Sequence, residues 1–214
     1  MSIRVLIADD HKVVAEGLYH LLAAQRDVEV VDTVRNGREA VRRTLELHPE
    51  VILMDSNMPD LNGIEATRII RDRYPPARVL MLSVHSDPLH VVRALRAGAA
   101  GYIPKISAGS DVVDAIRKVH SGKRYLHPTI AEAVLGQLVE PRSVEDPGAR
   151  LSSRERQVLQ LLAEGKSVSD IALSLSLSPR TVETYRARMM EKLDIRDVPS
   201  LVKFAILHGI TSLE

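Results

Sequence analysis

The stretch Val51-Ile52-Leu53-Met54-Asp55 is a short apolar run that ends in a carboxylate. Four similar runs occur in the first part of the chain, at residues 3–8, 28–31, 79–82 and 100–103. Between the runs lie segments with apolar residues at helical spacing, at residues 12–25, 37–47, 63–73, 87–97 and 110–120. Buried strands that alternate with helices are typical of a parallel sheet covered on both faces. We therefore predict an α/β doubly wound, five-stranded parallel sheet with the strand order 2-1-3-4-5.

The second part of the chain is helical only. Ser152-Ser153-Arg154-Glu155 has the spacing of a capping box, and Ser178 precedes Pro179, as expected of an N-cap followed by proline. We predict a small all-α domain of four helices, with the second and third joined by the tight connection of a helix-turn-helix.

A polar segment separates the two parts. Residues 140–148 contain two prolines and one glycine among charged residues, a composition typical of a linker. We predict a first domain over residues 1–122, a linker over 123–148 with a helix near 128–139, and a second domain over 149–214.

Composition narrows the class of protein. The absence of cysteine excludes disulfides and thiolate metal sites and suits a reducing cytoplasm. Aromatic residues make up 3% of the chain and there is no Trp, which disfavours nucleic-acid binding by base stacking. No apolar run approaches the roughly 20 residues of a membrane span. The net charge is +1, so DNA binding would depend on local placement of charge.

Polar side chains follow four of the five predicted strands. The first strand leads into Asp9-Asp10, the third ends at Asp55, the fourth leads into Ser83, and the fifth reaches Lys105. In an open parallel sheet, the carboxyl ends of the strands meet at one edge, where ligands bind at the topological switch point. With the predicted order, this point lies between the two strands that carry the three aspartates. We expect the five side chains to converge on one crevice.

The chemistry of this set indicates phosphoryl transfer. Three clustered carboxylates stay ionised only beside a compensating cation, and hard oxygen ligands favour Mg²⁺ or Mn²⁺. Lys105 adds a positive charge and Ser83 a hydroxyl donor. A carboxylate nucleophile, a divalent metal, a lysine and a hydroxyl are the components of phosphoryl transfer to Asp.

Three motifs lie at these strand ends: Asp9-Asp10-His11, residues 54–63 (MDSNMPDLNG), and residues 101–105 (GYIPK). They resemble the receiver domain of bacterial two-component response regulators, a flavodoxin-like fold, over about residues 1–122. The resemblance implies that Asp55 accepts a phosphoryl group from a sensor histidine kinase. The residues that it implies around Asp55 are Asp9, Asp10, Asp55 and the backbone carbonyl of Asn57 for Mg²⁺, and Ser83 and Lys105 for the phosphoryl group. Beyond self-phosphotransfer and slow autodephosphorylation, we expect no enzymatic activity.

Tyr102 lies at the aromatic switch position of that family. The resemblance implies that phosphorylation draws Ser83 toward the phosphate and lets Tyr102 turn inward, which alters the face built from the fourth helix, fifth strand and fifth helix. Two residues depart from the family pattern. Ser56 stands where an apolar residue is usual, and we expect it to loosen the packing under the site. Pro104 precedes Lys105, whereas relatives often place proline after the lysine.

The third predicted helix of the second domain has two unlike faces. Val182, Tyr185, Met189 and Leu193 share an apolar face that should pack against the preceding helices. The opposite face carries small and charged residues, namely Glu183, Thr184, Arg186, Ala187 and Arg188. Small side chains let a helix enter a major groove, arginines reach phosphates or guanines, and Arg180 at the helix start suits a phosphate.

Residues 151–159, 163–167, 178–186 and 190–193 resemble the LuxR-type helix-turn-helix, over about residues 148–212. A receiver followed by this domain is the architecture of NarL/FixJ-type response regulators. The residues implied to contact DNA are Arg180, Thr181, Glu183, Thr184, Arg186, Ala187, Arg188 and Lys192. Those implied in dimerisation are Val198, Leu201, Val202 and Ala205. Because many relatives have Lys at position 183 and His at position 185, base preference does not carry over.

We interpret the chain as a phosphorylation-controlled transcription regulator. The expected partners are a sensor histidine kinase, double-stranded DNA with a two-fold symmetric operator, RNA polymerase, and a second copy of the phosphorylated chain, without a membrane. We expect phosphorylation to uncover the DNA-binding helix. Two other functions stay open: a receiver that docks partners without phosphate while DNA binding is always on, and a metal-dependent hydrolase. The hydrolase lacks a general acid, because Asn57 stands where aspartate-based phosphatases have a second Asp.

Overall fold

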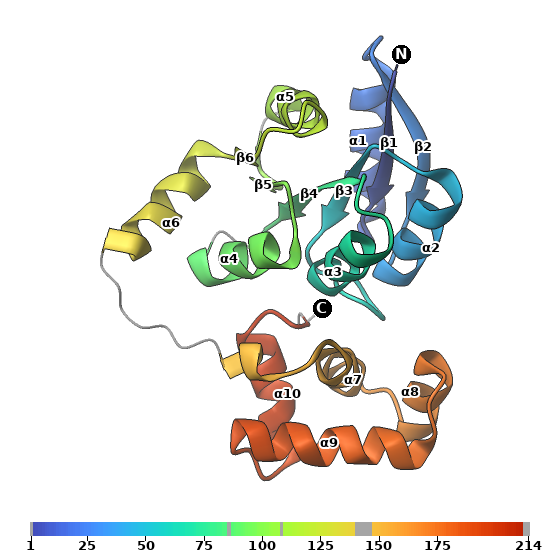
Figure 1. Cartoon of the computed structure of the whole chain (residues 1–214), viewed down its shortest axis with the longest axis vertical. Helices are drawn as coiled ribbons and strands as arrows, with labels where there is room; N and C mark the ends of the chain where they lie inside the picture. Colours follow the sequence, from blue (N-terminus) through green and yellow to red (C-terminus); the bar gives the residue numbers. More distant parts are fainter. Residues whose placement is uncertain (1, 85–86, 108, 140–146, 212–214) are drawn as a thin grey trace. The chain divides into compact units, whose positions relative to one another are not determined.

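The computed structural model of the chain describes residues 2–84, 87–107, 109–139 and 147–211. The chain divides into two compact units, Met1–Ser143 and Val144–Glu214, whose elements are labelled in Figure 1. No helix in the part of the chain that the structure describes combines the length and the apolar character that a membrane span requires.

The first unit is built on a parallel sheet with the strand order β2-β1-β3-β4-β5-β6. The strands are β1 (Ile3–Ala8), β2 (Val28–Val34), β3 (Val51–Asp55), β4 (Arg78–Ser83), β5 (Gly101–Pro104) and β6 (Tyr125–Leu126). The helices are α1 (Lys12–Ala23), α2 (Gly37–Leu47), α3 (Gly63–Arg73), α4 (Pro88–Ala97), α5 (Gly109–His120) and α6 (Pro128–Val139). The predicted doubly wound fold and the order of its first five strands are confirmed. A sixth short strand extends the sheet beside β5.

The central strand β3 is buried on both faces. Val51 and Leu53 point into the core under α1 and α5, whereas Ile52 and Met54 point into the core under α2, α3 and α4. The two helix layers lie on opposite sides of the sheet in Figure 1. Burial on both faces explains why the strand reads as a continuous apolar run rather than as an alternation.

The segment after α5 packs on the first unit. Ile130 in α6 is fully buried, and Leu126 in β6 and Val134 in α6 pack against the same core. The sequence analysis placed this stretch at the start of a linker, but its apolar side chains join the core beside α4 and β5. The central part of the predicted linker, residues 140–146, lies outside the described residues.

The second unit begins with a 3₁₀ turn (Pro147–Arg150) and continues through α7 (Ser153–Ala163), α8 (Val168–Leu175), α9 (Pro179–Leu193) and α10 (Val198–Leu207). Ser152 and Glu155 form the predicted capping box at α7, and Ser167 and Asp170 form a second one at α8. Ser178 caps α9, with a proline in its first turn. Each cap satisfies backbone N–H groups that a helix start leaves unpaired. The four predicted helices and the tight α8–α9 connection are confirmed.

Candidate functional site

The predicted phosphoacceptor residues lie at one edge of the sheet. Asp9 follows β1, Asp55 ends β3, Ser83 ends β4 and Lys105 follows β5. Asp9, Asp55 and Ser83 are buried, whereas Asp10 is half-buried. The strand order therefore brings together side chains that are far apart in the sequence, as the topology of a parallel sheet requires.

The Lys105 ammonium joins the two buried carboxylates. Its Nζ atom lies 2.7 Å from Asp55 Oδ2 and 2.8 Å from Asp9 Oδ2. Burial and the charge of Asp9 raise the pKa of Asp55 to about 7, although Lys105 acts to lower it. Desolvation lowers the pKa of Lys105, but the two carboxylates outweigh this effect and the net pKa is raised. The site thus holds a desolvated carboxylate beside a charged ammonium.

The loop after β3 is packed tightly against Asp55. Asn57 donates its backbone N–H to Asp55 Oδ1 over 3.3 Å. Gly63, the first residue of α3, donates its N–H to the Ser56 carbonyl over 2.9 Å. A Cβ atom at Gly63 would lie 1.9 Å from the Asp55 carbonyl oxygen, so no larger residue fits without moving the loop. The glycine of the MDSNMPDLNG motif therefore keeps the start of α3 close to the phosphoacceptor.

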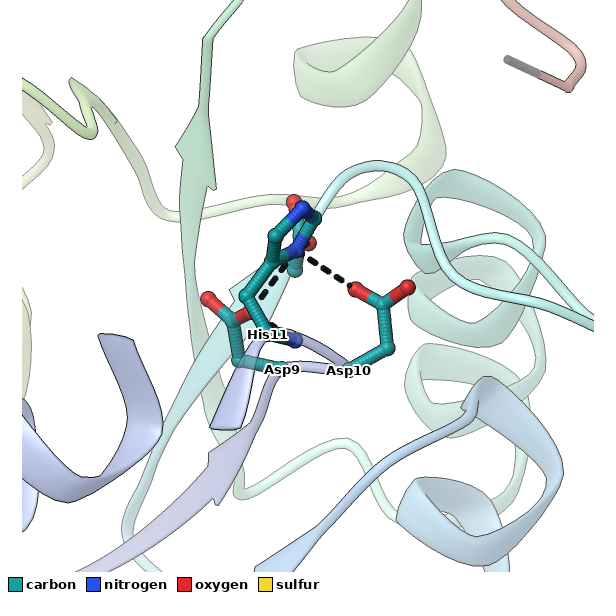
Figure 2. Close-up of side chains that lie close together, drawn as sticks. Asp9, Asp10 and His11 are labelled. Carbon is teal, nitrogen blue, oxygen red and sulfur yellow. Dashed lines mark hydrogen bonds and ion pairs between the residues drawn. The ribbon is translucent and has the colours of Figure 1, made fainter. Parts of the chain in front are cut away.

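His11 belongs to the acidic cluster, which the sequence analysis did not predict. Its Nδ1 atom lies 2.9 Å from Asp10 Oδ1 and 3.4 Å from Asp9 Oδ1, and Figure 2 shows the imidazole folded back over the carboxylates. Ligand atoms of Asp9, Asp10, His11 and Asp55 all lie within 4.8 Å of one another. Three carboxylates and one imidazole form a donor set that fits a divalent metal ion. The position of His11 directly after Asp10 was the sequence signal for its presence there.

Three hydroxyl groups interact near the ends of β3, β4 and β5. Ser56 Oγ donates to Ser83 Oγ over 2.7 Å, and the Tyr102 hydroxyl is hydrogen-bonded with Ser83. Tyr102 is fully buried, and this burial raises the pKa of its hydroxyl. The centroid of its ring lies 6.5 Å from the centroid of the His90 ring, in an edge-on arrangement. Tyr102 thus occupies the inward position, and Ser56, rather than loosening the packing as we expected, has its hydroxyl paired.

The DNA-binding candidates lie on the outer face of α9. Val182 and Met189 are buried and Tyr185 and Leu193 pack partly against the same core, so the predicted apolar face is confirmed. The other predicted residues are exposed (Arg180, Thr184, Ala187, Arg188 and Lys192) or half-buried (Thr181, Glu183 and Arg186). This face therefore offers small and basic side chains to a partner.

Two ion pairs modify that face. Arg186 Nη2 lies 2.7 Å from Glu183 Oε2, so Glu183 orients a neighbouring arginine. Lys192 Nζ lies 2.7 Å from Glu155 Oε2, and the Glu155 side chain is only 3% exposed. Desolvation raises the pKa of Glu155, but Lys192 and the Ser152 cap outweigh it and the net pKa is lowered. Lys192 therefore has a structural partner in α7, which the sequence analysis did not foresee.

The predicted dimerisation residues of α10 divide into two pairs. Leu201 and Ala205 are 1% and 0% exposed and belong to the core of the second unit. Val198 is 39% exposed and Val202 is half-buried. Because one stripe of the helix packs inward, Val198 and Val202 are the members of the set with side-chain surface left for a second chain.

Comparison with known proteins identifies the family. Residues 5–117 match the response regulator receiver domain, and residues 149–205 match the bacterial regulatory proteins of the luxR family. The chain is 39% identical over 212 residues to response regulator UvrY of Escherichia coli K12, covering 99% of this chain and 97% of UvrY.

Solved structures of response regulators are similar in fold to this chain. A LuxR-family two-component response regulator from Aurantimonas sp. SI85-9A1 has 34% identity and a TM-score of 0.63, over 65% of this chain and 99% of that one. The response regulator RcsB in a complex with DNA has 25% identity and a TM-score of 0.62, over 99% of this chain and 100% of that one.

A receiver with an intact acidic edge, followed by a helix-turn-helix, defines a two-component response regulator that controls transcription by binding DNA under phosphorylation. Within this class, the chain belongs to the NarL/FixJ-type response regulators.

Proposed function

We propose that Asp55 is the phosphoacceptor and that Mg²⁺ is held by Asp9, Asp10, Asp55 and the backbone carbonyl of Asn57. The observation that carries the proposal is the Lys105 ammonium, which lies between Asp55 and Asp9 at 2.7 and 2.8 Å. A buried carboxylate with a positive charge beside it supports the role of Asp55 as the nucleophile. Mn²⁺ suits the same oxygen ligands.

In the transfer, an Asp55 carboxylate oxygen attacks the phosphorus of a phosphohistidine on the sensor kinase, whose other ring nitrogen carries a proton. The N–P bond breaks, its electron pair stays on the ring nitrogen, and a neutral imidazole leaves. Lys105 neutralises the charge of the new acyl phosphate, and the Ser83 hydroxyl donates to one of its oxygens. A bound divalent ion offsets the remaining negative charge of the carboxylates and the phosphoryl group. Slow hydrolysis of the acyl phosphate is the only other reaction that we assign to the site.

Phosphorylation of Asp55 releases or dimerises the DNA-binding unit, which acts on RNA polymerase at a two-fold symmetric operator. The exposed arginines at the start and middle of α9 contact phosphates or bases, and Val198 and Val202 contribute to the dimer. The solved DNA complex of the RcsB relative supports a DNA-binding role for this architecture. Since the kinase domain that donates the phosphoryl group and the DNA are both cytoplasmic, we place the protein in the cytoplasm.

Labelling of the full chain with radioactive acetyl phosphate and Mg²⁺ tests the phosphoacceptor. Stable label is expected on the natural chain and no label on Asp55→Asn. Asp72→Asn is the matched control, because its side chain is 68% exposed on α3, away from the acidic edge. Label that persists on Asp55→Asn would identify another acceptor, and rapid turnover would indicate a hydrolase.

Operator affinity with and without beryllofluoride, a phosphoryl mimic, tests the control of DNA binding. Tighter binding with beryllofluoride is expected in the natural chain and not in Asp55→Asn. Equal affinities in the natural chain would reject phosphorylation control and favour a receiver that serves only to dock partners.

A further inference from the structure

The Ser83 hydroxyl is hydrogen-bonded with Ser56, a residue that has no role in the proposed phosphoryl transfer. Ser56 Oγ donates to Ser83 Oγ over 2.7 Å, and Ser56 is only 1% exposed. This distance is that of a well-formed O–H···O hydrogen bond. A buried hydroxyl without a partner is costly, so the pairing holds both groups in place.

Backbone hydrogen bonds from the two neighbouring segments fix the backbone around Ser83. The Ser56 N–H donates to the Leu82 carbonyl over 2.9 Å, and the Lys105 N–H donates to the Ser83 carbonyl over 2.8 Å. These bonds join the end of β4 to the segments that follow β3 and β5. The freedom that remains to Ser83 is rotation of its side chain among staggered rotamers. The Ser56 hydroxyl selects one of them.

The hydrogen-bonding capacity of Ser83 matches this arrangement. A serine hydroxyl has one hydrogen to donate and two lone pairs that accept. Ser56 fills one lone pair of the Ser83 oxygen. The proposed function requires the Ser83 hydroxyl to donate its hydrogen to a phosphoryl oxygen. An apolar residue at position 56 would leave the first lone pair unfilled and the rotamer unselected.

We propose that Ser56 is a positioning residue that pre-orients the Ser83 hydroxyl for the phosphoryl group, and that it thereby raises the affinity of the receiver for that group. The inference rests on the proposed function of Asp55 and Ser83. It assigns to Ser56 an effect that acts through Ser83 alone.

A double-mutant cycle on the full chain tests this coupling. Beryllofluoride affinity is measured by isothermal titration calorimetry with Mg²⁺ for the natural chain, Ser56→Ala, Ser83→Ala and the double variant. Ser56→Ala is expected to weaken binding about three- to tenfold, the range of one net hydrogen bond. In the Ser83→Ala background, the same substitution is expected to change nothing, because the hydroxyl through which it acts is gone.

Thr44→Val is the matched control. Thr44 is fully buried on α2, and its hydroxyl donates to the Ala40 carbonyl over 2.7 Å. The substitution removes a buried hydroxyl elsewhere in the receiver, so it is expected to lower stability and leave beryllofluoride affinity unchanged. An isosteric pair, Ser56→Thr and Ser56→Val, repeats the comparison without a cavity, and the threonine variant is expected to bind more tightly.

The inference is overturned if Ser56→Ala leaves the affinity unchanged, if it weakens binding equally in both backgrounds, or if the threonine and valine variants bind equally. These outcomes leave the proposed function intact when the natural chain binds beryllofluoride and Asp55 is labelled. If the natural chain does neither, the proposed function fails and the inference fails with it.

Discussion

The buried Asp55 carboxylate makes the stability of the receiver depend on pH when divalent cations are absent. Burial and the charge of Asp9 raise its pKa from 3.8 to about 7. Between these two values, the folded chain keeps the proton on Asp55 while the unfolded chain releases it. A raised acid pKa therefore adds stability at low pH, and this stability is lost as the pH rises through about 7.

The size of the effect follows from the two pKa values. Between about pH 5 and pH 8, one group with these values changes the free energy of unfolding by about 2–3 kcal/mol. Asp55→Asn removes the titrating group and keeps its size, and Lys105 retains its contact with Asp9 Oδ2 at 2.8 Å. The variant is expected to lack this component. The difference between the two proteins therefore isolates the contribution of Asp55 to the pH dependence of stability.

Urea unfolding of both proteins in EDTA, followed by tyrosine fluorescence, measures the effect. The chain has no Trp and five Tyr, of which Tyr19, Tyr74, Tyr102 and Tyr125 lie in the first unit. Mg²⁺ is expected to restore stability at the higher pH in the natural chain and much less in Asp55→Asn. If the pH responses of the two proteins agree within about 0.5 kcal/mol, the folded-state titration of Asp55 near neutrality is refuted.

The DNA-binding unit can be tested by three substitutions. Arg186→Ala is expected to weaken binding to all DNA sequences and to reduce the slope of log affinity against log salt concentration by about one unit. DNA titrations at several salt concentrations measure this slope. An unchanged slope would show that Arg186 does not contact a phosphate. Lys192→Met leaves the buried Glu155 carboxylate without its partner at 2.7 Å. The substitution is expected to lower the free energy of unfolding by about 1–2 kcal/mol. A urea midpoint equal to that of the natural chain would show that the ion pair does not contribute to stability. Val198→Glu is expected to reduce dimerisation of the beryllofluoride-bound chain at an unchanged Tm, since Val198 is 39% exposed; sedimentation that still reports a full dimer would exclude this residue from the interface.

Local patterns were sufficient to predict the elements and the edge where the site lies. The apolar run at residues 51–54 predicts a buried strand, and Ser152 and Ser178 mark the starts of α7 and α9, because capping and burial depend on near neighbours in the sequence. The convergence of Asp9 and Asp55 was also predictable, since the polarity of a parallel sheet obliges its strand ends to share one edge. For these features, the sequence by itself determines the outcome.

Partners that come from different elements required the tertiary structure. The Ser56–Ser83 hydrogen bond, the Lys192–Glu155 ion pair and the burial of Leu201 in the core of its own unit depend on how elements pack. An amphipathic pattern shows that a helix has an apolar stripe, but it does not show which members of the stripe are used within the unit and which face a second chain. Ångström-scale separations between side chains decide whether a polar residue loosens a core or orders it, and only packing sets those separations.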